Sequence, residues 1–201
     1  MPSEYDPLFA GARAKEESDD LEPVRDRFLA ASKPYLRAYW TWAAWALILP
    51  AAAFLTPAAF SFRGPRGVLF LWSIAILLGG AVEFLAIRKA GRSAPASGLA
   101  RWALRAQGNL SFVAVLLSGL LFWVDAAWAV PGVWLLLLGH SFYILGGISF
   151  PPFRRYGLIY QIGGFAALWP GGAPLLVLAL ALFLGNVWMA WAVWRERASG
   201  D

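Results

Sequence analysis

The sequence predicts an all-α fold: a polytopic transmembrane bundle of six helices, preceded by an amphipathic interfacial helix. The chain of 201 residues is 60% hydrophobic and 14% charged, whereas charged residues make up about a quarter of a soluble domain. Its mean hydropathy is +0.58. The chain contains repeated apolar runs, and most of them are close in length to the roughly 20 residues that a helix needs to cross the hydrocarbon core of a bilayer. We therefore expect the bilayer itself to be the main partner of the chain.

The N-terminal region is predicted to lie outside the membrane. Residues 1–20 are polar and of mixed charge, which is typical of a mobile tail. Residues 21–38 are predicted to form a juxtamembrane helix that lies on anionic headgroups, because an apolar stripe runs along an otherwise basic segment. The residues of that stripe are Val24, Phe28, Ala31 and Tyr35. A helix that docks on a partner protein is the alternative.

Six apolar segments are predicted to cross the membrane within residues 39–194, and residues 195–201 to form a C-terminal tail. The segments are Tyr39 to Phe60, Gly67 to Ile87, Gln107 to Val124, Gly132 to Phe150, Gly157 to Trp169 and Ala173 to Trp194. The fifth is the shortest and needs flanking residues or a locally thinner bilayer to cross.

The basic residues predict the orientation. With the N-terminus in the cytoplasm, 15 of the 17 Lys and Arg residues fall on the cytoplasmic side, and only Arg63 and Arg66 fall outside. The cytoplasmic loops hold Arg88, Lys89, Arg92, Arg101, Arg105, Arg154 and Arg155. We expect a multi-pass protein of the cytoplasmic (inner) membrane with both termini in the cytoplasm. Because this topology accounts for the net charge of +5, we do not expect nucleic acid to be a partner.

Helix contacts are predicted where small residues recur four positions apart, because small side chains let helices approach closely in lipid. The pairs are Ala75/Gly79, Ala114/Ser118, Gly163/Ala167 and Ala181/Gly185. The Gly-Gly pairs at Gly79, Gly146 and Gly163 suggest that the two halves are inverted repeats, although no longer repeat is evident in the sequence.

Glu83 is the most informative intramembrane residue. It continues the face of Ala75 and Gly79 and should point into the bundle, where a carboxylate is costly unless it is paired or functional. The residues that could reach its depth are Arg154, Arg155, Tyr160 and Gln161. A structural pair near the interface is the simpler reading, and a proton or cation site is the alternative.

His140 is the only histidine of the chain and is predicted to lie near the middle of the bilayer, with Tyr143 one turn away. A neutral imidazole bonded to a neighbouring helix is the simpler reading. A haem site is not expected, because Met189, the candidate for a second axial ligand, lies at a different depth. Asn186 in the last segment is predicted to bond between helices.

No catalytic signature is present: there is no metalloprotease motif, nucleophile elbow or phosphate-binding loop. The chain has no cysteine, so thiolate metal sites and cysteine nucleophiles are excluded. We expect neither a cofactor nor a metal site.

The second half resembles uncharacterised small bacterial six-span integral membrane proteins. The resemblance is carried by VPGVWLLLLGHSF, GGISFPPFRRYGLIYQIGGFAALWP and GNVWMAWAVWRER. It implies a bacterial cytoplasmic membrane and no catalytic residue.

Two functions remain open. The first is a non-enzymatic accessory, scaffolding or sensory component that acts through helix contacts with a protein partner, with a homo-oligomer also possible. The second is a small-molecule or ion carrier, or its substrate-binding subunit, with a polar site formed by Glu83, His140, Gln161 and Asn186. Convergence of those four side chains on one enclosed cavity would favour the carrier, whereas separate satisfied polar groups would favour the accessory component.

Overall fold

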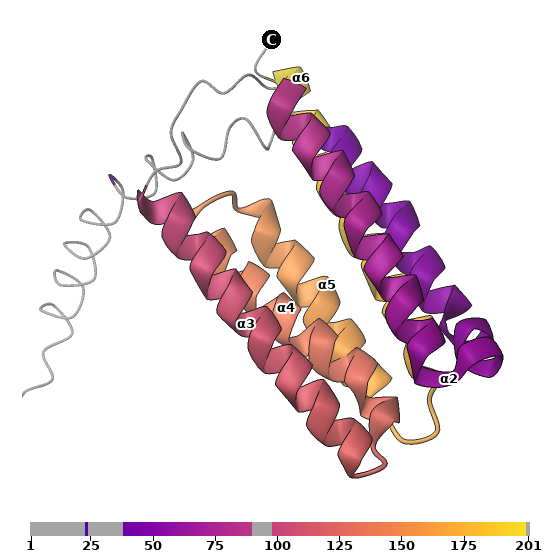
Figure 1. Cartoon of the computed structure of the whole chain (residues 1–201). Coiled ribbons are helices and arrows are strands. Elements are labelled where there is room, and N and C mark those ends of the chain that lie inside the picture. The colour runs from indigo at the N-terminus through magenta and orange to yellow at the C-terminus, as the bar shows by residue number, and fades with distance from the viewer. Residues whose placement is uncertain (1–22, 24–37, 90–97, 200–201) are drawn as a thin grey trace, which may run out of the picture.

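The computed structural model describes residues 38–89 and 98–199, together with Pro23, of the 201-residue chain. The predicted tail at 1–20 and nearly all of the predicted interfacial helix at 21–38 lie outside the described residues. The described residues form five α-helices and one short 3₁₀ turn (Figure 1). These are α2 (Tyr39–Lys89), α3 (Gly98–Trp123), η1 (Ala127–Ala129), α4 (Val130–Ile148), α5 (Pro152–Ala167) and α6 (Pro174–Ser199).

Helix α2 is a hairpin. Its 51 residues would span about 77 Å if straight, more than twice the thickness of a hydrocarbon core. The backbone leaves the helical region at Arg63 (φ −138°) and at Gly64, whose φ of 57° is left-handed and suits glycine. The chain reverses there, so the arms formed by residues 39–62 and 65–89 lie side by side (Figure 1).

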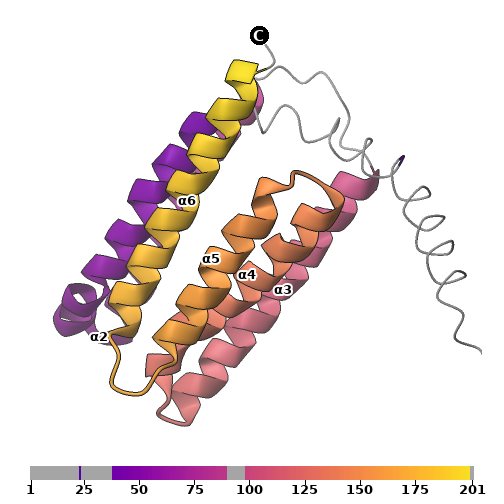
Figure 2. The same cartoon turned by 180° about the vertical axis from the view of Figure 1, so that it is seen from behind.

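The other helices pack mainly on their neighbours in sequence, and the last helix also packs on the first described one. Helix α4 packs along α5, α5 packs along α6, and α6 packs along α2. Helix α3 rests chiefly on α4 and leaves most of its surface exposed. Figure 2 shows α5 and α6 between the α2 hairpin and the α3–α4 pair, so these two helices join the two sides of the bundle.

Glycines at intervals of seven residues bring α4 and α5 into backbone contact. They are Gly132, Gly139 and Gly146 on α4 and Gly157 and Gly164 on α5. A Cβ atom added at Gly139 would lie 2.8 Å from both the backbone nitrogen of Gln161 and the carbonyl oxygen of Gly157. The absence of side chains at these positions therefore lets the two backbones touch.

The distribution of side-chain size is that of a membrane bundle. The buried positions are mostly alanines and glycines, while large apolar side chains such as Leu69, Phe70 and Leu77 are 68%, 64% and 72% exposed. Large apolar side chains on the outside suit a hydrocarbon solvent, and small ones inside allow close helix packing. Four helices of the described residues are long and apolar enough to cross a membrane. This part of the chain is thus an all-helical membrane bundle.

The predicted count of six spans is not supported. Every predicted segment coincides with helix, but only four candidate spans occur in the described residues: α2, α3, η1 with α4, and α6. Two predicted spans are the two arms of α2, which together make one candidate span, and α5 with 16 residues is only about 24 Å long. Two ends also differ from the prediction, because α3 begins at Gly98 and α6 continues to Ser199.

The small-residue pairs were correctly predicted to mark helix contacts. Gly79 lies beneath the ring of Trp45, where an added Cβ would collide with the indole. A Cβ at Gly163 would lie 2.6 Å from Cβ of Ala181, which joins two of the predicted pairs across the α5–α6 interface. Ala114 is 1% exposed on α3, which packs chiefly on α4.

Two consecutive hairpins share one packing arrangement. In the α2 hairpin, Thr56 donates to the carbonyl four residues before it and accepts a 3.1 Å hydrogen bond from Trp72 Nε1. In the α3–α4 hairpin, Ser118 donates to the carbonyl four residues before it and accepts a 2.9 Å hydrogen bond from Trp134 Nε1. The hydroxyl and the indole are 16 residues apart in both. This similarity relates the two neighbouring hairpins, and the predicted inversion of the halves stays a prediction.

Candidate functional site

Glu83 is held within the α2 hairpin. It lies half-buried on the second arm and accepts a 3.0 Å hydrogen bond at Oε1 from Nε1 of Trp45 on the first arm. The bare backbone of Gly79 makes room for this indole. No ion pair joins Glu83 to a basic residue in the described part of the chain, so the partners expected from the loops and from α5 are replaced by an indole of the same hairpin.

Asn186 lies in a buried polar network between α5 and α6. Its Nδ2 donates to the Tyr160 hydroxyl at 3.1 Å and to the Leu182 carbonyl at 2.7 Å. The hydroxyls of Tyr156 and Tyr160 lie 2.7 Å apart, and Tyr156 also donates to Oδ1 of Asn186 at 3.3 Å. Asn186, Tyr156 and Tyr160 are at most 3% exposed. The prediction that Asn186 bonds between helices is confirmed.

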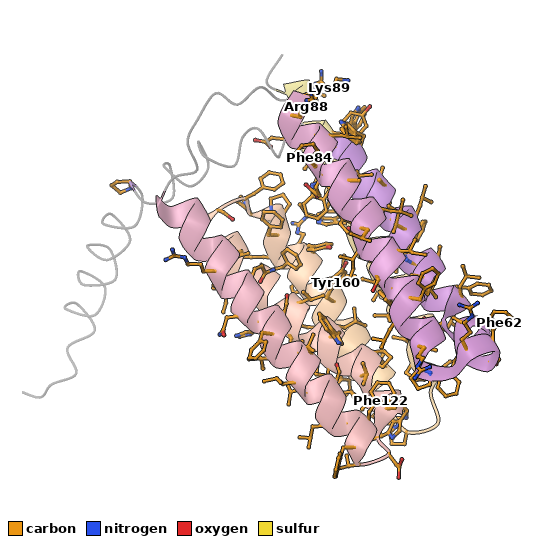
Figure 3. The ribbon with its side chains drawn as sticks, viewed as in Figure 1. Phe62, Phe84, Arg88, Lys89, Phe122 and Tyr160 are labelled. Atoms are coloured by element: carbon orange, nitrogen blue, oxygen red, sulfur yellow. The ribbon has the colours of Figure 1, made fainter. Side chains whose placement is uncertain are left out.

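Aromatic rings from two further helices enclose this network. Trp42 of α2 and Phe142 of α4 make edge contacts with Tyr156 at centroid distances of 5.5 and 4.6 Å. Figure 3 shows Tyr160 deep among the helices. Every buried side-chain nitrogen and oxygen of the described residues has a hydrogen-bond partner. The network therefore joins four helices, and its buried polar atoms are satisfied within the protein.

Two further amide side chains lie at helix contacts. Gln107 of α3 accepts a 2.6 Å hydrogen bond from the Ser141 hydroxyl of α4. Gln161 is half-buried on α5 and lies close to Gly139 of α4. Both positions join helices at their mutual interfaces.

His140 and Tyr143 point out of the bundle. His140 was expected to bond to a neighbouring helix, but it is exposed, as are Tyr143, Ile144 and Gly147. These four residues occupy successive turns of one side of α4, and we name them the α4 outer face. The α4 residues that pack on α5 and α3 lie on other sides of the helix, and they are Gly132, Gly139, Gly146, Trp134 and Ser141. Within the outer face, Gly147 lies beside the guanidinium of Arg154 of α5.

The four residues considered for a carrier site do not meet. Glu83 contacts the first arm of α2, Gln161 lies at the α4–α5 contact, Asn186 bonds to tyrosines of α5, and His140 faces outward. None of them lines the hollow formed by Tyr39, Trp40, Leu85, Arg88 and Lys89. The groups of Asp, Glu and His in the described residues also include no set of three that could hold a metal ion.

Apart from Arg63 and Arg66 at the reversal of α2, the described basic residues gather at one end of the bundle, where α2 and α6 end and α3 and α5 begin (Figure 1). Arg88 and Lys89 line a hollow with Tyr39, Trp40 and Leu85. Arg155 lies 5.4 Å above the ring of Trp188. Arg105 and Arg154 are exposed, whereas Arg92 and the side chain of Arg101 lie outside the described residues.

Comparisons with protein-family models, with curated proteins and with solved structures found no match. The resemblance of residues 130–197 to small bacterial membrane proteins therefore stays a prediction.

Several residues of the polar contacts were not predicted. Tyr156 and Trp45 belong to no recognisable sequence motif. Tyr156 precedes Tyr160 by four residues, however, and so must share its helix face. The seven-residue glycine spacing on α4 was also readable in the sequence, and it marks the closest helix contact.

Proposed function

We propose that the chain is a non-enzymatic integral membrane protein, an accessory or scaffolding component that binds a partner membrane protein through the α4 outer face. The observation that carries this proposal is the placement of the intramembrane polar groups. Glu83 and Asn186 are satisfied at separate helix contacts, which is the arrangement expected of a structural bundle. His140 and Tyr143 are turned outward instead.

The depth of His140 supports a protein partner on this face. His140 lies ten residues after Val130 and eight before Ile148, so it is about 12–15 Å from either end of α4. An imidazole facing hydrocarbon at that depth is costly, and ionisable residues in membrane helices generally face protein. A partner helix with a hydrogen-bonding side chain would remove that cost.

The proposal includes a six-crossing topology in a bacterial cytoplasmic membrane with both termini inside. The reversal at Gly64 divides α2 into two arms of membrane-spanning length, and α5 crosses as a short helix flanked by the loops on either side. This threading puts Arg63 and Arg66 on one side and the other described basic residues on the opposite side, as the positive-inside rule requires.

The test is site-specific crosslinking in native membranes. A photoreactive amino acid replaces His140 in one variant, Tyr143 in a second and Leu116 of α3, which is 57% exposed, in a control. We expect one discrete adduct from the α4 positions and none from position 116. We also expect His140→Leu to release the co-purifying protein without changing the thermal stability of the chain.

Each outcome is informative about the partner. An adduct with twice the 22.0 kDa mass of the chain would identify a second copy as the partner. An adduct of larger or smaller mass would identify a different protein. A monomer that purifies with a small molecule and gives no adduct at positions 140 and 143 would overturn the accessory function in favour of a carrier.

A further inference from the structure

The two ends of the α2 hairpin form a hollow at the basic end of the bundle. Tyr39 and Trp40 come from the first turn of α2, and Leu85, Arg88 and Lys89 from its end. The hairpin brings these segments together although they are more than 40 residues apart in sequence. The hollow has a volume of about 720 Å³, which is within the range of small-molecule sites. Figure 3 shows Arg88 and Lys89 together at this end, with Phe84 just below them.

The lining combines two cations with aromatic side chains that carry polar groups. A guanidinium and an ammonium bind phosphate oxygens, and Tyr and Trp favour the depth of lipid headgroups. Among the described residues that line the hollow, none is acidic. Glu83, the nearest carboxylate in the sequence of the second arm, is bonded to Trp45.

Arg88 and Lys89 differ from two other basic residues at this end, Arg155 and Arg195. Arg155 and Arg195 each lie 5.4 Å above a tryptophan ring, of Trp188 and Trp191 respectively. No hydrogen bond, ion pair or ring contact to another described residue holds Arg88 or Lys89. Within the described part of the chain, neither charge is engaged by another side chain.

We propose that this hollow binds a phosphate group, as presented by the headgroup of an anionic phospholipid. Leu85 and Phe84 extend the hollow toward the membrane as a 56% and 59% exposed apolar surface, which suits an acyl chain attached to that phosphate. The site is independent of the α4 outer face, because it lies on the α2 hairpin. Failure of one proposal leaves the other intact.

The experiment measures lipid binding to the full chain, delipidated in detergent, by native mass spectrometry. Phosphatidylglycerol and phosphatidylcholine are titrated separately, and inorganic phosphate is added as a competitor. The test variant is Arg88→Gln/Lys89→Gln. The control is Arg195→Gln/Arg197→Gln, which removes the same charge at the same end of the bundle but outside the hollow.

We expect phosphatidylglycerol to bind more tightly than phosphatidylcholine. Because one basic residue near anionic lipid contributes about fivefold in affinity, the test variant should bind phosphatidylglycerol about 30-fold more weakly. The control variant should change that affinity by less than about threefold, since screening limits the reach of its charges.

The competitor separates two sources of phosphate. Phosphatidylglycerol binding that persists in millimolar inorganic phosphate supports a lipid headgroup. Inorganic phosphate binding that depends on Arg88 and Lys89, without any preference between the lipids, supports a soluble phosphate ligand of the same site. Equal phosphatidylglycerol and phosphate affinities in the wild type and the test variant would overturn the proposal.

Discussion

Replacing Gly139 with alanine tests the glycine contact between α4 and α5. The added Cβ would lie 2.8 Å from the Gln161 nitrogen and the Gly157 oxygen and 2.9 Å from Cγ of Gln161. Ordinary contacts begin at 3.4 Å, so the helices must separate by about 0.6 Å at these atoms. Two of the three are backbone atoms, and a rotamer change cannot move them away.

The expected cost follows from two opposing effects. Overpacking of a well-packed interface costs about 1–3 kcal/mol, while alanine gains about 1 kcal/mol over glycine in helix propensity. The matched control is Gly119→Ala on α3, where an added Cβ has no neighbour within 4 Å. Because the propensity gain is common to both variants, the difference between their free energies of unfolding should be about 1–3 kcal/mol, with Gly139→Ala the less stable.

Reversible unfolding in mixed detergent micelles, followed by helical circular dichroism, measures this difference. If Gly139→Ala is as stable as Gly119→Ala, the α4 and α5 backbones are not in contact and the packing argument is wrong. A double variant of Gly139 and Gly146 should be less stable than either single variant, since both glycines contact α5.

Three further predictions use the same unfolding measurement. Glu83→Gln should keep the wild-type free energy of unfolding within about 0.5 kcal/mol, because its amide oxygen still accepts the Trp45 bond, whereas Glu83→Leu should lose about 1 kcal/mol. Asn186→Leu should lose about 1–2 kcal/mol, because a buried tyrosine hydroxyl and a carbonyl lose their donor. Trp72→Phe and Trp134→Phe should each lower the free energy of unfolding by about 0.6–1.7 kcal/mol. The two losses should be similar, because the two hairpins make the same hydrogen bond.

Each of these predictions has a contrary result. Failure of Glu83→Gln to assemble would show that the negative charge itself is required, and so would reveal a cationic partner. An Asn186→Leu variant of wild-type stability would mean that the tyrosine hydroxyls satisfy one another. Markedly unequal effects of the two tryptophan variants would show that the hairpins are not energetically equivalent.

Much of the fold could be predicted because a bilayer imposes strong local rules. Long apolar runs must be helical to satisfy their backbone hydrogen bonds, and every predicted segment is helical. The small-residue pairs likewise marked real contacts, since Gly79 meets the first arm of the α2 hairpin and Gly163 meets α6. The ends of α3 and α6 were misjudged, because helices can continue through charged residues beyond an apolar run.

The candidate site was harder to predict because partners depend on rotation about helix axes. Glu83 was recognised as an inward carboxylate. Its partner Trp45 lies 38 residues away and is uncharged, so a search for a cationic partner could not find it. His140 was placed at the right position along its helix and on the wrong side of it. Hydropathy measures how apolar a segment is, and it carries little information about which side of a nearly uniformly apolar helix faces its neighbours.

The sequence by itself determined that the chain is an all-helical membrane protein and which small residues lie at contacts, because both follow from composition and short-range spacing. Only the tertiary structure decided that α2 folds back at Gly64, that glycines join α4 to α5, that polar groups are satisfied pairwise rather than around a cavity, and that His140 faces outward. These features depend on how separate helices approach and rotate, which is set by packing between segments distant in sequence.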